Sequence, residues 1–149
     1  MERITLLDPP PVASHKSRVW PITGVVLGLA LAATLYFSFR YYPEKKVTRE
    51  FFDALVAGDT NRAYDLWKPT QSYRKSDFMD DWGPTGYWGP VKSYKIMSAK
   101  APSKSDSVEV DVAVSPYAPL PPESALESAK TRVVRLWISP NDKSFSFPP

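Results

Sequence analysis

The feature that most constrains this chain is an uncharged, strongly apolar run at residues 19–39, VWPITGVVLGLALAATLYFSF. At about 1.5 Å per helical residue, a run of this length spans the roughly 30 Å hydrocarbon core of a bilayer. Trp20 stands near one end, and Tyr41 and Tyr42 stand just beyond the other, where aromatic residues favour the membrane–water interface. The pattern predicts a single transmembrane helix over residues 19–42.

A cleaved signal peptide is the rival interpretation of this run. Ala30-Leu31-Ala32 resembles the small-residue site at which signal peptides are cut. The apolar run nevertheless continues beyond that site to Phe39. We therefore expect an uncleaved anchor. Gly24, Gly28 and Ala32 recur every fourth residue on one face of it, where small side chains let another membrane helix approach closely.

Basic residues flank the run in almost equal numbers on its two sides. They are Arg3, Lys16 and Arg18 before it, and Arg40, Lys45, Lys46 and Arg49 after it. The positive-inside rule therefore does not decide the orientation, but a long C-terminal domain can be translocated despite a few basic residues. We expect a cytoplasmic tail at residues 1–18, a span in the cell (inner) membrane, and a periplasmic or extracellular domain at 44–149. The tail contains Pro9-Pro10-Pro11, which favours an extended polyproline II segment.

Composition excludes several classes of function. The chain has 19 basic and 16 acidic residues, a formal net charge of +3, and these are interspersed, so nucleic-acid binding has little support. Cysteine is absent and His15 is the one histidine, which removes disulfides and thiolate catalysis and argues against a metal site or a catalytic triad. We expect no metal and no cofactor.

After Pro43 the apolar residues recur at helical spacing, from Val47 to Leu55. Gly58 provides a left-handed stop, and Asp59 is a good N-cap for a second helix. A third short helix is predicted over Ser76–Trp82, with Ser76 as its cap.

Beyond residue 90 the apolar period changes to two, which predicts strands at 91–99, 107–115, 131–139 and 144–147. In the second of these, four valines alternate with Glu109, Asp111 and other residues, so we expect the valines inside and the two acids on the solvated face. Three short helices packed on a curved antiparallel sheet of about four strands describe an α+β domain.

The segment FFDALVAGDTNRAYDLW, residues 51–67, resembles the opening helices of the nuclear-transport-factor-2-like superfamily, a cone-shaped fold shared with ketosteroid isomerase. Members often begin with an aromatic-rich helix, a Gly/Asp break and then Ala-Tyr-x-Leu. Over residues 44–149 the chain is similar to small membrane-anchored bacterial domains of that superfamily. The resemblance implies a cone that is open at one end.

Such a cone offers a possible pocket lined by Phe52, Tyr64 and Trp67, together with Trp82 and Trp88. The alternative is that these aromatics fill the cone, because a domain of about 105 residues needs large side chains to build a core. Core filling is the interpretation that we favour.

The superfamily includes enzymes, and an isomerase of this fold would need a buried carboxylate base and a Tyr or a protonated acid as oxyanion donor. The candidate acids are Asp77, Asp80, Asp81, Glu109 and Asp111, and the candidate donors are Tyr64, Tyr87 and Tyr94. No acid is flanked by apolar residues in a pattern that requires burial. The sequence therefore predicts no catalytic residue.

The aromatic loop WGPTGYWGP, residues 82–90, joins the third helix to the first strand. Trp82 is expected to point inward from the end of the helix, whereas Tyr87 and Trp88 are harder to bury between Gly and Pro. Because Trp and Tyr are favoured interface anchors, we expect partner binding at Trp82, Tyr87 and Trp88. Tyr117 joins them from SPYAPLPPESALESAK, residues 115–130, a stiff Pro-rich segment that is either an interface or a harmless insertion.

These observations favour a non-catalytic, single-pass accessory or assembly subunit. Its partners would be the integral membrane proteins of a larger complex, reached through the span and the aromatic loop, and the lipid bilayer. The runner-up is a membrane-anchored binder or sensor of a small apolar ligand. An isomerase-like enzyme is third.

Overall fold

The computed structural model describes residues 19–122 and 131–149, and the predicted tail at 1–18 lies outside them. Two compact units meet between Phe37 and Ser38. Helix α1 (Val19–Phe39) makes up the described part of the first unit, continues two residues past its boundary, and is exposed from Pro21 onward. Among the described residues it begins the one helical stretch long and apolar enough to cross a membrane. That property fits a membrane span or a signal sequence.

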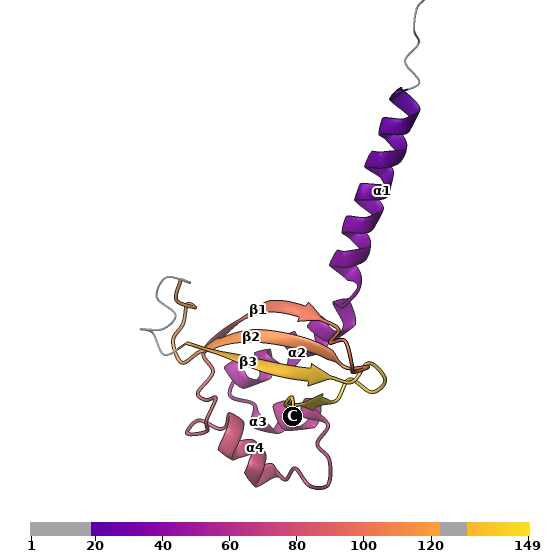
Figure 1. Cartoon of the computed structure of the whole chain (residues 1–149). Coiled ribbons are helices and arrows are strands. Elements are labelled where there is room, and N and C mark those ends of the chain that lie inside the picture. The colour runs from indigo at the N-terminus through magenta and orange to yellow at the C-terminus, as the bar shows by residue number, and fades with distance from the viewer. Residues whose placement is uncertain (1–18, 123–130) are drawn as a thin grey trace, which may run out of the picture. The chain divides into compact units, whose positions relative to one another are not determined.

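The second unit is an α+β domain, as predicted (Figure 1). Its helices are α2 (Tyr42–Val56), α3 (Thr60–Trp67) and α4 (Lys75–Trp82). Its strands are β1 (Ser93–Lys100), β2 (Val108–Ser115), β3 (Arg132–Ile138) and β4 (Phe145–Ser146). They form one open antiparallel sheet in the order β1-β2-β3-β4, and the three helices lie on one face of it.

The predicted break between the first two helices of the domain is confirmed. Gly58 has φ +76°, which glycine adopts without the steric cost of a Cβ. The Asp59 side chain accepts a hydrogen bond from the Arg62 N–H at 3.0 Å, so Asp59 caps α3. Pro43 lies in the first turn of α2, where a missing N–H costs nothing, and so it begins a helix as well as following one.

The predicted start of the third domain helix is wrong by one residue, and its predicted cap is wrong by two. Arg74 is the N-cap of α4, and its backbone N–H donates to Asp77 Oδ2 at 2.8 Å. An acid at the third helical position can bind the N-cap backbone from inside the helix. Asp77 therefore binds the backbone at the start of the helix from inside it, and Ser76 lies within the first turn.

The alternation in β2 separates the two faces of the sheet as predicted. The inner face is formed by buried aliphatic side chains, namely Val108, Val110, Val112, Val114, Val134, Leu136 and Ile138. Register brings them into layers, because Val110 pairs with Leu136 and Val112 pairs with Val134. The helices cover this face.

An aromatic core lies between the helices and the inner face of the sheet. Its members are the buried residues Phe51, Phe52, Trp67, Phe78, Trp82 and Phe145. The ring of Phe51 has its centroid 5.1–6.3 Å from the ring centroids of all the other five. Aromatic pairs at these distances stabilise a core beyond the area that they bury.

Candidate functional site

The residues predicted to line a pocket in the cone contribute to this packing instead. Phe52 is fully buried and stacks on Tyr94 at 5.1 Å. Trp67 is buried and stacks on Phe145 at 5.5 Å, although its edge borders a surface hollow of about 240 Å³ beside Tyr73. Tyr64 is half-buried, and its ring meets that of Phe78 edge-on at 5.3 Å. The structure places these side chains in or against the core.

Trp82, expected among the partner-binding residues, is only 2% exposed. As the last residue of α4 it turns its ring toward the helices and packs against Phe51 at 5.2 Å and Phe52 at 5.6 Å. The Trp82 side chain is therefore packed in the core and has little surface left for a partner. This corrects its assignment to the partner-binding residues and agrees with the expectation that it points inward. One face still reaches the aromatic loop, because Trp88 stacks on it at 6.2 Å.

The aromatic loop is fixed to the end of α4 by backbone hydrogen bonds. The N–H groups of Tyr87 and Trp88 donate to the carbonyls of Asp80 and Asp81, each at 2.8 Å, and the Gly86 N–H donates to the Gly83 carbonyl at 2.9 Å. The last turn of a helix leaves carbonyls without intrahelical partners. The loop supplies those partners, and in return its own backbone is held in one conformation.

Gly89 is required by the closeness of this packing. A Cβ built at position 89 would lie 1.9 Å from the Gly83 carbonyl oxygen, far inside van der Waals contact. The two Trp-Gly-Pro units of the loop therefore touch through their glycines. A larger residue at position 89 would push the loop away from α4.

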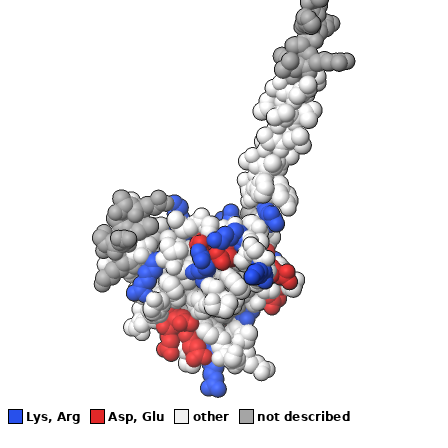
Figure 2. All heavy atoms as spheres, in the orientation of Figure 1, with Lys and Arg blue, Asp and Glu red and all other residues white. Residues whose placement is uncertain are grey.

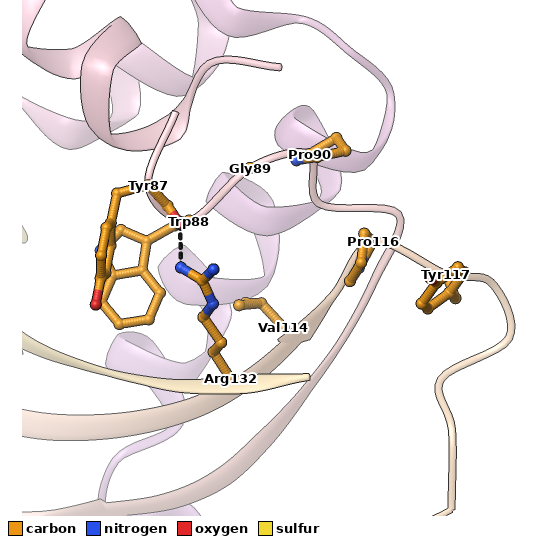
Figure 3. Close-up of a pocket in the computed structure, with 8 residues that line it drawn as sticks. All are labelled: Tyr87, Trp88, Gly89, Pro90, Val114, Pro116, Tyr117 and Arg132. Atoms are coloured by element: carbon orange, nitrogen blue, oxygen red, sulfur yellow. Dashed lines mark hydrogen bonds between the residues drawn. The ribbon is translucent and has the colours of Figure 1, made fainter. Parts of the chain in front are cut away.

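Arg132, at the start of β3, holds the outer side of the loop (Figure 3). Its guanidinium donates to the Tyr87 carbonyl and lies 4.9 Å from the centroid of the Tyr87 ring. Tyr87 in turn meets Trp88 edge-on at 4.9 Å and 88°. Although its backbone and ring are held in this way, Tyr87 remains 65% exposed.

A hollow of about 280 Å³ opens beside these residues. Figure 3 shows Tyr87 and Trp88 on one side of it and Pro116 and Tyr117 on the other, with Arg132 between them. Tyr117 is 52% exposed, and its backbone is positioned by the side chains of Ser93 and Ser115. Three of the four predicted partner-binding residues thus line one hollow. Arg132 is the member that the sequence analysis missed.

Of the three candidate catalytic tyrosines, Tyr94 is bound to a carboxylate, whereas the Tyr64 hydroxyl donates to the Tyr73 carbonyl at 3.3 Å. Tyr94 donates to Asp53 Oδ1 at 2.7 Å, and Tyr73, which was not a candidate, donates to Asp81 Oδ2 at 2.6 Å. Burial, followed by these hydrogen bonds to carboxylates, raises the pKa of both phenols. A phenol whose pKa moves further above neutrality is a poorer proton donor at neutral pH. Asp53 is also exposed, so this pair lacks the burial that such a base requires.

Glu109 lies on the outer face of the sheet as predicted, but it is buried and not solvated. Its Oε1 is 3.0 Å from Lys100 Nζ and 3.2 Å from Arg135 Nε, and Trp137 Nε1 donates to its Oε2 at 3.3 Å. These side chains come from β1 and β3, on either side of β2, and cover the carboxylate. Lys100 holds the pKa of Glu109 below its usual range, with Trp137 and Arg135 assisting.

The neighbouring Asp111 continues this ionic ladder. Arg135 Nε lies 2.8 Å from Asp111 Oδ1, and this interaction lowers the pKa of Asp111. Figure 2 shows acidic and basic side chains intermixed on the visible face of the second unit. Within the described ranges no group of three or more His, Cys, Asp or Glu side chains is arranged to hold a metal ion.

The small residues of α1 leave open space beside the helix. A Cβ added at Gly24 or Gly28 would meet nothing within 4 Å, and Ala32 is exposed. The predicted packing face thus has room for a neighbouring helix, and whether one lies there stays a prediction.

Comparison of the chain with known protein families, with curated proteins and with solved structures gives no match. The resemblance of residues 51–67 to the nuclear-transport-factor-2-like helices therefore stays a prediction.

Proposed function

We propose that this protein is a single-pass membrane-anchored accessory subunit that docks on a larger membrane complex. The domain would be a cone-like member of the nuclear-transport-factor-2-like superfamily, held outside the cytoplasm by α1. The anchor is supported by a helix without a single charge that exposes its apolar side chains from Pro21 to Phe39. Exposed apolar surface of this extent is stable in lipid or against other membrane helices.

One observation carries the docking role. Tyr87 is 65% exposed although its backbone donates to α4 and its carbonyl and ring are held by Arg132. An aromatic side chain fixed in advance loses little conformational entropy on binding, which is what makes an effective interface anchor. The Tyr87 ring contacts Arg132 and Trp88, yet most of the residue stays accessible to a partner.

The role of ligand binder has less support. The aromatic side chains that would line the cone fill it, and Phe51 alone packs against five rings. Catalysis also has less support, because the acids hydrogen-bonded to tyrosine lack the apolar burial that an isomerase base uses.

The test is purification of the tagged full-length chain from membranes in mild detergent, with quantitative mass spectrometry of the proteins that accompany it. We expect a stoichiometric set of membrane proteins, which Tyr87→Ala depletes. Val133→Ala is the matched control, because Val133 is 53% exposed on the opposite face of the sheet and should leave the set unchanged. Gly28→Leu tests the contribution of the span. A chain that purifies alone would refute the proposal.

A further inference from the structure

Among the residues that the structure describes, those that line the hollow beside the aromatic loop include one positive charge and no negative one. Arg132 is the single charged residue among the eight that line it, and the others are aromatic or small, or are proline. No carboxylate among the described residues forms an ion pair with Arg132. The surface therefore complements a partner group that is anionic and joined to an apolar body.

The geometry of Arg132 suits a carboxylate. One terminal nitrogen donates to the Tyr87 carbonyl, which fixes the plane of the guanidinium, and a guanidinium has five N–H donors in all. Figure 3 shows the other terminal nitrogen beside the first, with no hydrogen bond drawn to it, and Pro90, Val114 and Pro116 line the same hollow. A carboxylate is an acceptor that matches these parallel donors.

Size and lining indicate what else enters the hollow. At about 280 Å³ it falls just below the range of about 300–1,000 Å³ typical of pockets that enclose a small-molecule ligand. It is large enough for one or two side chains of a bigger partner. Tyr87 and Trp88 form a right-angled corner, and Tyr117 stands across from it. Grooves lined by aromatic rings recognise polyproline II segments, which are already extended and lose little entropy on docking.

We infer that this hollow binds an extended, proline-containing segment of a partner protein, with an acidic side chain of that segment on Arg132. The inference rests on the proposed docking function and names the chemistry of the partner. Tyr87 and Trp88 contact the prolines, and the guanidinium selects the acid.

The test is fluorescence anisotropy of labelled peptides with the full-length chain in detergent. The probes are heptapeptides of proline in which one Glu is moved through each position, with a Gln series and a Gly-for-Pro series as controls. We expect at least one Glu peptide to bind, and to bind at least fivefold more tightly than its Gln and its Gly-for-Pro counterparts. Arg132→Gln should abolish the preference for Glu, whereas Arg62→Gln, an exposed arginine on α3, should keep it.

Three results would overturn the inference: no peptide binds, Glu and Gln peptides bind equally, or Arg132→Gln instead converts a dimer into a monomer, which would make a second copy the occupant. Unchanged thermal melting of Arg132→Gln would exclude misfolding as the cause of a loss. If peptides fail while Tyr87→Ala still depletes the copurifying proteins, this inference fails and the docking function stands.

Discussion

The aromatic core and the aromatic loop use the same kinds of side chain for different purposes. In the core, Phe51 is fully buried and its ring packs against five others. In the loop, Tyr87 is held by backbone hydrogen bonds and by Arg132 but is mostly exposed. Trp82 and Trp88 connect the two regions by stacking. A side chain can therefore be held in place without being buried, and an aromatic side chain of this kind marks a candidate interface.

The largest effect is expected from the core. Phe51→Ala removes a ring that contacts five others, and large-to-small changes of this kind cost about 3–5 kcal/mol because a cavity remains. The free energy of unfolding, measured by denaturant titration of the full chain in detergent, should fall by that amount. A loss below about 1 kcal/mol would mean that the core is loosely packed and that the domain has room for a ligand.

The next effect is expected where the loop meets α4. Gly89→Ala places a Cβ against the Gly83 carbonyl, and overpacking of this kind costs about 1–3 kcal/mol. Thermal melting should detect the loss, and partner recovery should fall with it because the loop moves. Thr85→Ala, an exposed change in the same loop, is the control and should alter neither quantity.

A smaller effect is expected from the ionic ladder on the outer face. Glu109→Gln weakens the interactions with Lys100 and Arg135, and about 1 kcal/mol is expected because both basic side chains are half exposed and screened. Binding to the partner should be unaffected. A measurable loss of binding would place part of the interface on this face of the sheet.

The same ladder predicts a direction for the effect of pH. The pKa values of Glu109 and Asp111 are lowered in the folded state, so the unfolded chain binds more protons when the pH falls below the ordinary values near 4. The stabilisation is present above that range and is lost as the pH falls through the folded values. Denaturant midpoints between pH 6 and 3 should decline less steeply for the double variant Glu109→Gln, Asp111→Asn than for the wild type.

Sequence patterns were sufficient where a feature depends on neighbours in the chain. The alternating valines of β2 predicted which face of the sheet is buried, and Asp59 was identified as a cap from its place after Gly58. Features that depend on pairing register were missed. Arg132 reaches Tyr87 from 45 residues away, and Glu109 is covered by residues of two neighbouring strands. Because side chains alternate between the two faces of a sheet, a one-residue shift in strand pairing would turn Arg132 and Glu109 to the opposite faces.

Trp82 was assigned to the interface because it belongs to the aromatic loop, although its side chain was expected to point inward. Its direction is set by its place on the last turn of α4, on the same face as Phe78, and both side chains are buried. Helical position therefore outweighs membership of the loop. The exposure of Tyr87 was indicated by its Gly and Pro neighbours, but its contact with Arg132 had no comparable signal because the two residues are far apart in the sequence.

The smallest effect on stability is expected at Tyr87 itself. Tyr87→Ala removes an exposed ring and leaves the backbone hydrogen bonds of the loop, so the free energy of unfolding should change by about 0.5 kcal/mol or less. The loss of unfolding free energy should therefore be far smaller for Tyr87→Ala than for Phe51→Ala. A large destabilisation by Tyr87→Ala would mean that the ring supports the fold and is not free to bind a partner.

The most direct measurement is site-specific photo-crosslinking in native membranes, with a photoreactive phenylalanine at position 87 and, as the control, at position 133. We expect position 87 to give a discrete crosslinked band that contains the same protein in repeated preparations. We expect no band from position 133. Crosslinks from position 133 alone, or from neither position while the protein is folded and membrane-bound, would contradict docking through the aromatic loop.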